Sequence, residues 1–125
     1  MGHPAGDAPS YVIIGPGGRV VAGRARIARS FLSRLVGLLA QASLDAGEAL
    51  VIPAGQAIHT IGMRFPIDVA FVDRAGCVVA MRHAMRSGRL TPIIWRATAA
   101  IELAAGVLRR CAIHVGDRLS IEPKT

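Results

Sequence analysis

Four polar side chains of four chemical types lie close together in an otherwise apolar stretch of this 125-residue sequence. The stretch is IHTIGMRFPIDVAF, residues 58–71, and the four residues are His59, Thr60, Arg64 and Asp68. A histidine beside a carboxylate can act as a general acid or base near neutral pH. An arginine can hold an anion through two parallel hydrogen bonds. The stretch is therefore a candidate binding site, with His59 and Asp68 as candidate catalytic residues.

Asp68 also fits a purely structural role. Pro66 cannot donate a backbone hydrogen bond and favours an extended backbone at Phe65, so we expect a loop here and a strand that starts near Asp68. A carboxylate at the head of a buried strand needs a partner, because burying it unpaired is costly. We expect Asp68 to accept backbone N–H groups from a loop, or to pair with His59 or Arg64. This structural interpretation is favoured over catalysis.

Glu102 is the distant candidate to join this cluster. It stands alone in an apolar run, and the alternative is an outward-facing strand residue. The candidate ligand-binding residues are thus His59, Thr60, Met63, Arg64, Asp68 and Glu102. The sequence contains no HExxH, G-x-S-x-G, Walker or paired-cysteine zinc pattern, so we expect no metal and no cofactor, and leave enzymatic activity open.

The formal net charge of +7 raises the question of nucleic-acid binding. The positive residues are nearly all arginines, scattered from Arg19 to Arg118, and Lys124 is the sole lysine. Aromatic residues that could stack on bases are few. The favoured function is therefore a binding module for an anionic small molecule or peptide near the 59–68 loop. A hydrolase-like enzyme using His59 and Asp68 is the first alternative, and non-specific nucleic-acid binding through the scattered arginines is the second.

Other features concern location and burial. No apolar run reaches the roughly 18 residues of a membrane helix, and MGHPAGDAPS does not resemble a secretory signal. We expect a cytoplasmic protein without a membrane span, with a flexible N-terminus over 1–10 and a single domain over 11–125. Cys77 and Cys111 fit no metal or redox spacing and are expected to be buried free thiols. Trp95 is expected in the core, with an interface anchor as the alternative.

The apolar pattern predicts several short strands and one main helix. Strands are expected over 11–14, 19–27, 48–52, 69–72, 77–81, 93–104 and 118–121, a helix over 31–41 and a helical turn over 107–111. Turns at 15–18 and 73–76 join hairpins, whereas 82–90 is expected to be a surface excursion. The fold class is α+β, mainly antiparallel, with a rolled sheet or partial barrel and the main helix packed on one face.

Four segments carry a family resemblance: GLL at 37–39, IHTIGMRFPIDVAFVDRAGCVV at 58–79, IELAAG at 101–106 and HVGDRL at 114–119. In this order they resemble the prokaryotic domain-of-unknown-function family 192 (DUF192), from about residue 19 to 121. The resemblance implies a small, mostly β domain with a packed helix, and implies no reaction, because the family has no established activity. The family pattern often has Phe or Trp near Ile61 or Gly62, so an aromatic-lined site does not carry over.

Overall fold

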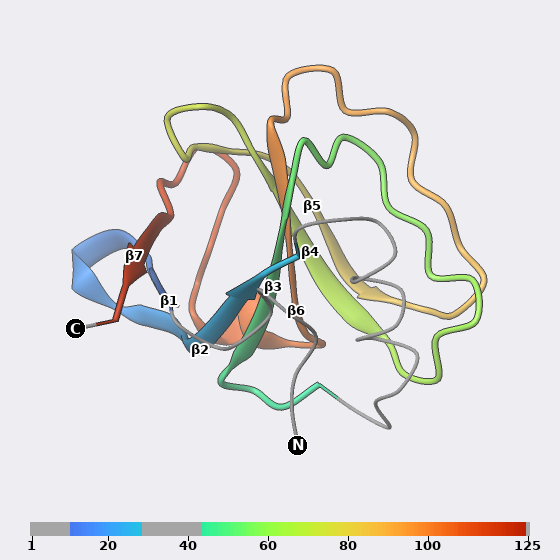
Figure 1. Ribbon diagram of the computed structural model, residues 1–125, viewed down its shortest axis with the longest axis horizontal. Coiled ribbons are helices and arrows are strands. Elements are labelled where there is room, and N and C mark those ends of the chain that lie inside the picture. Colours follow the sequence, from blue (N-terminus) through green and yellow to red (C-terminus); the bar gives the residue numbers. More distant parts are fainter. Residues whose placement is uncertain (1–10, 29–43, 125) are drawn as a thin grey trace.

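The computed structural model describes residues 11–28 and 44–124, in which seven strands form one sheet (Figure 1). The strands are β1 (Tyr11–Ile14), β2 (Val20–Ile27), β3 (Glu48–Pro53), β4 (Ile67–Val72), β5 (Val78–Met85), β6 (Ala99–Ala104) and β7 (Ser120–Pro123). Their order in the sheet is β5-β4-β6-β3-β2-β1-β7. The described residues also form a 3-10 turn, η1 (Pro16–Gly18), and a short helix, α2 (Val107–Arg110). The main helix predicted over 31–41 lies outside the described residues.

The sheet is mixed and open, which corrects the partial-barrel prediction, while the coarse α+β class is confirmed. Strands β2 and β3 run parallel, and the other neighbouring pairs are antiparallel. The outer strands β5 and β7 do not pair along their lengths; a single bridge joins Cys77 and Arg118, just ahead of them. Hairpins alone give antiparallel neighbours, whereas a parallel pair needs a long crossover connection. The chain between β2 and β3 supplies that connection.

Most predicted strands are confirmed, with three corrections. Strand β5 continues to Met85, so the predicted surface excursion over 82–90 begins only after it. The β character predicted over 93–104 holds only for Ala99–Ala104. Before this strand, the amides of Ile94 and Ala97 bond to carbonyls in loops instead of a strand ladder. The last strand is Ser120–Pro123, displaced from the predicted 118–121.

The turn between β4 and β5 forms as predicted. The Gly76 N–H donates to the Asp73 carbonyl at 2.9 Å, which closes a four-residue turn. Asp73 Oδ1 accepts the N–H groups of Ala75 at 2.9 Å and Cys77 at 3.0 Å. Gly76 has a φ of +86°, and the Leu119 carbonyl oxygen lies 2.5 Å from where a Cβ would stand. Backbone conformation and close contact both require glycine there.

Alternating side chains of the central strands supply two apolar clusters, one on each face of the sheet. The helix-side core combines strand residues with α2 and includes Ala70, Val72, Ile101, Leu103, Val107 and Leu108. The loop-side core includes Leu50, Ile58, Met63, Ile67, Val69, Phe71, Met85, Ala97 and Ala100. Strand β4 is buried along its whole length. Burial on both faces explains why 67–72 is almost continuously apolar.

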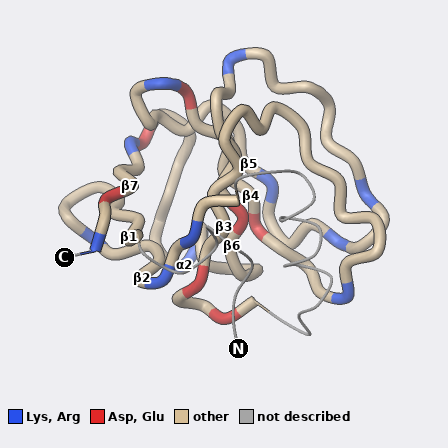
Figure 2. The backbone as a smooth tube through the Cα atoms, viewed as in Figure 1, with Lys and Arg blue, Asp and Glu red and all other residues tan. Residues whose placement is uncertain are grey.

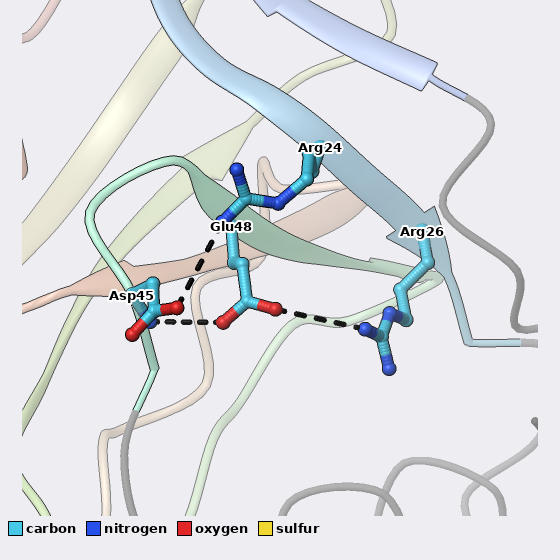
Figure 3. Close-up of polar contacts among 4 residues, drawn as sticks. All are labelled: Arg24, Arg26, Asp45 and Glu48. Atoms are coloured by element: carbon cyan, nitrogen blue, oxygen red, sulfur yellow. Dashed lines mark hydrogen bonds and ion pairs between the residues drawn. The ribbon is translucent and has the colours of Figure 1, made fainter.

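Ion pairs hold the parallel β2–β3 pairing at the start of β3 (Figure 3). Arg26 Nη2 lies 3.8 Å from Glu48 Oε2, and both side chains are 19% exposed. Arg24 Nη2 lies 3.9 Å from Asp45 Oδ2, with both side chains largely exposed. The other Glu48 oxygen accepts the Asp45 N–H at 2.9 Å. Because exposed ion pairs contribute little, the half-buried Arg26–Glu48 pair is the more important of the two.

We expect Gly76→Ala to lower the free energy of unfolding by about 2–5 kcal/mol, from left-handed backbone strain and the clash with the Leu119 carbonyl. Gly17→Ala is the matched control, because Gly17 also has a positive φ but nothing within 4 Å of its Cβ position. It should lose only about 1–2 kcal/mol. Urea unfolding measures both losses. Equal losses would contradict the close-contact explanation.

Candidate functional site

Asp68 lies near the start of β4, fully buried on the face of the helix-side core. Its Oδ1 accepts the Ala84 N–H from β5 at 2.8 Å. Its Oδ2 accepts the N–H groups of Gly106 at 3.1 Å and Leu108 at 3.0 Å, at the start of α2. The sequence allowed backbone N–H groups, His59 or Arg64 as partners of Asp68, and the structure shows three backbone N–H groups. The carboxylate therefore connects β4 to β5 and to α2.

The bond to Ala84 has a local cause in a β-bulge. The pairing of β4 with β5 shifts register opposite Asp68, where β5 carries an extra residue. Ala84 lies in this bulge with a φ of +47°. A bulge leaves a backbone group outside the ladder, and the Asp68 carboxylate accepts that N–H. Strand β5 can therefore continue to Met85 without an orphaned amide at the bulge.

Glu102 and Asp68 lie on opposite faces of the sheet. Residues directly opposed in a ladder point to the same face. Asp68 is opposite Leu103 of the helix-side core, whereas Glu102 is opposite Leu50 and Val69 of the loop-side core. Glu102 is also fully buried, so an outward-facing position is wrong. The sheet therefore separates the two carboxylates.

His59 and Thr60 lie in one of two long loops that run side by side (Figure 1). We call these loops, residues 54–66 and 86–98, the loop pair. Two antiparallel strand pairings bracket it: Ile67 faces Met85 at one end, and Pro53 faces Ala99 at the other. Between these ends the loops exchange backbone hydrogen bonds, including Thr91 N–H to the Ile58 carbonyl, 2.9 Å, and Ile94 N–H to the Gln56 carbonyl, 2.8 Å.

Thr60 is the side chain that joins the two loops most extensively. It is fully buried, and its hydroxyl donates to the Arg86 carbonyl and accepts the Arg89 N–H, the latter at 2.9 Å. Its backbone N–H donates to the Arg89 carbonyl at 2.9 Å, and its carbonyl accepts the Gly88 N–H at 3.1 Å. The neighbouring His59, which is half-buried, forms a bridge with Leu90. Thr60 thus fixes how the loops meet.

The sheet separates the Asp68 side chain from the loop that carries four of the other candidate residues, whereas Glu102 faces the same side of the sheet as that loop. His59, Thr60, Met63 and Arg64 share one loop, in which Met63 is buried in the loop-side core and Arg64 is exposed. Ile58 packs in the same core as Met63, so this loop covers the face opposite the Asp68 carboxylate. Glu102 faces the loop-side core from the sheet.

Sequence reasoning missed a group of exposed apolar side chains on the loop pair. The exposed fractions are 76% for Trp95, 73% for Leu90, 56% for Ile61 and 50% for Ile93. The expected core position of Trp95 is therefore wrong. The strand-breaking Ser87-Gly88 and Pro92 were the signal that this segment forms a loop, where apolar side chains need not be buried.

The loop pair is also positively charged. Its exposed arginines are Arg64, Arg86, Arg89 and Arg96, and neither loop contains an aspartate or glutamate. Figure 2 shows blue without red along both loops, at the right of the view. A surface that carries positive charges and no negative ones favours an anionic partner. The loop pair can therefore attract negative charge and offer apolar contact on the same element.

The cysteines and histidines give no second cluster in the described residues. Cys77 and Cys111 are free, and half-buried rather than buried as predicted. Within 11–28 and 44–124, no three histidine, cysteine or acidic side chains are grouped in a way that would hold a metal ion. None of the helices described there has the length and apolar character needed to cross a bilayer.

We expect Asp68→Asn to lower the free energy of unfolding by about 2–3 kcal/mol, because an amide places N–H groups against a backbone N–H in a buried site. Asp73→Asn is the matched control. Asp73 accepts both its bonds at Oδ1, which an asparagine retains, so it should lose less than about 1 kcal/mol. Urea unfolding compares the two variants. A loss in Asp68→Asn no larger than in the control would contradict the assigned bonding.

Two solved structures are similar to this chain. A protein from Sinorhizobium meliloti 1021, described as a "putative transcription regulator", aligns with a TM-score of 0.79 at 17% identity, covering 96% of this chain and 98% of that chain. A protein of unknown function from Novosphingobium aromaticivorans DSM 12444 aligns with a TM-score of 0.74 at 20% identity, covering 89% and 83%. At these identities the likeness shows the fold alone.

Family membership comes from the sequence. No curated protein matches this chain. The family model of DUF192, described as "Uncharacterized ACR", matches residues 12–121, nearly the whole chain. This range contains β2 to β6, the Asp68 site and the loop pair. The match confirms the resemblance carried by the IHTIGMRFPIDVAF stretch, and the chain belongs to the DUF192 family.

Proposed function

We propose that this chain is a binding module whose loop pair takes up an anionic ligand that also carries apolar groups. An anionic small molecule or peptide of this kind fits the surface. The supporting observation is the coincidence of exposed arginines with exposed Ile61, Leu90, Ile93 and Trp95 in two loops that lack any acidic residue. Charge accelerates and orients the encounter, and burial of apolar area adds affinity.

The hydrogen bonds within the loop pair support this proposal. Thr60 and the backbone bonds of Thr91 and Ile94 hold the loops against each other before any ligand arrives. Ile58 and Met63 anchor one loop in the loop-side core. A surface organised in advance loses less conformational entropy on binding than a disordered one. The arginines and apolar side chains thus project from a fixed backbone.

The geometry gives less support to a hydrolase using His59 and Asp68. A catalytic dyad needs its histidine and carboxylate within hydrogen-bond reach. Both oxygens of Asp68 accept backbone N–H groups on the helix-side face, whereas the loop that carries His59 packs on the other face. The burial of Asp68 is explained by this bonding without a catalytic role.

The binding proposal is tested with anilinonaphthalene sulfonate, a small anionic and aromatic fluorescent probe. We expect Arg89→Glu/Arg96→Glu to weaken probe binding by about tenfold, because the loop pair loses positive charge and gains negative charge. The matched control is Arg109→Glu/Arg110→Glu, which changes the net charge equally at exposed arginines outside the loop pair. The control should weaken binding by less than about twofold, because distant exposed charges are screened.

Fluorescence titration gives the dissociation constants, and thermal unfolding verifies that each variant is folded. Equal weakening in both variants would assign the effect to net charge and contradict the loop-pair site. Absence of probe binding to the unmodified chain at low salt would also overturn the proposal.

A further inference from the structure

We propose that the partner of the loop pair is the surface of an anionic lipid bilayer. Leu90 and Trp95 enter the boundary between headgroups and acyl chains, and the neighbouring arginines contact lipid phosphates. This inference rests on the proposed function and deepens it by naming the class of partner. It concerns a protein lying on the membrane surface, with no segment crossing it.

The residue types on the loop pair match the layers of a membrane interface. The two most exposed apolar side chains each adjoin an arginine: Leu90 follows Arg89, and Trp95 precedes Arg96. Tryptophan is enriched at the membrane–water interface, where its apolar ring and its N–H group both find suitable surroundings. Arginine suits phosphate groups, and basic residues are attracted to anionic leaflets. In each pair the apolar side chain can therefore contact the acyl-chain boundary while the arginine contacts the phosphate layer above it.

The backbone amides that join the two loops of the loop pair are already bonded, and a fluid partner needs no such amides. The N–H groups of Thr60, Gly88, Thr91 and Ile94 already donate to carbonyls of the facing loop. Peptides that add to an exposed strand are held by backbone hydrogen bonds of the receptor. These four amides are not available for such bonds, whereas the arginine and apolar side chains of the loop pair are exposed. A lipid surface needs only charge attraction and apolar burial.

The aliphatic side chains distinguish a bilayer from a nucleic acid. Both partners attract arginine, but single-stranded nucleic acids also stack their bases on aromatic rings. Trp95 is the only aromatic residue of the segment 86–98. Ile61, Leu90 and Ile93 have no base-stacking role and are each at least half exposed. Transfer of such side chains into acyl chains is favourable. A bilayer therefore explains the exposed aliphatic side chains as well as the arginines, whereas a nucleic acid explains only the arginines and Trp95.

The proposal is tested by co-sedimentation of the full chain with vesicles. The vesicles contain phosphatidylcholine alone or with about one-third phosphatidylglycerol, which supplies the negative surface potential. We expect binding to the anionic vesicles to exceed binding to the neutral ones by about tenfold, and to fall as salt is raised. A blue shift of the Trp95 emission on binding reports that the single tryptophan leaves water.

The apolar contribution is tested by Leu90→Ser/Trp95→Ser. Its matched control is Val20→Ser/Val115→Ser, which removes two exposed apolar side chains outside the loop pair. We expect the loop-pair variant to lose binding to anionic vesicles by about tenfold or more, and the control by less than about twofold. Both variants alter exposed residues, and a thermal unfolding measurement checks that each variant is folded.

The outcomes separate this inference from the proposed function. If the unmodified chain binds anilinonaphthalene sulfonate through Arg89 and Arg96 but ignores anionic vesicles, the lipid partner is wrong while the binding module stands. Vesicle binding that survives Leu90→Ser/Trp95→Ser would also overturn the insertion of these side chains. Binding to a poly-thymidine strand that is stronger than binding to anionic vesicles would identify a nucleic acid instead.

Discussion

The Asp68 carboxylate is the interaction on which the rest of the structure depends. It accepts three backbone amides, from Ala84 in the β5 bulge and from Gly106 and Leu108 at the entry to α2. The bulge lies beside the Ile67–Met85 pair, where one loop of the loop pair ends and the other begins. Asp68 therefore supports the loop pair from the opposite face of the sheet, although its own side chain never faces it. A buried charge is tolerated because its bonds are supplied by amides that would otherwise be orphaned.

Thr60 plays the corresponding role within the loop pair. The buried hydroxyl, the backbone N–H and the carbonyl of this one residue fix the two loops at Arg86, Gly88 and Arg89. The polar residues of IHTIGMRFPIDVAF therefore have different roles, since Asp68 and Thr60 satisfy backbone groups while Arg64 is exposed on the outer surface. The proposed binding surface is what the loops present once their own hydrogen bonds have been made.

Local features of the sequence predicted much of this fold. The Asp73–Gly76 turn follows from residue preferences at two positions, and the backbone bonding of Asp68 follows from the cost of burying a carboxylate. The open, mixed sheet was not predictable in this way, because the parallel β2–β3 pairing depends on a long crossover. The exposure of Trp95 was missed because an apolar residue in an apolar segment is usually buried. Its exposure depends on the loops bonding to each other, a long-range property that no local pattern reveals.

The central claim is that the loop pair is a preformed surface, and residue-resolved amide hydrogen exchange of the free protein tests it most directly. The N–H groups of Thr60, Gly88, Thr91 and Ile94 donate across the two loops. If the loops are one fixed unit, these amides should exchange about as slowly as those of β4. Exchange at the rate of an open surface loop would contradict the account, because the exposed arginines and apolar side chains would then lack a common rigid support.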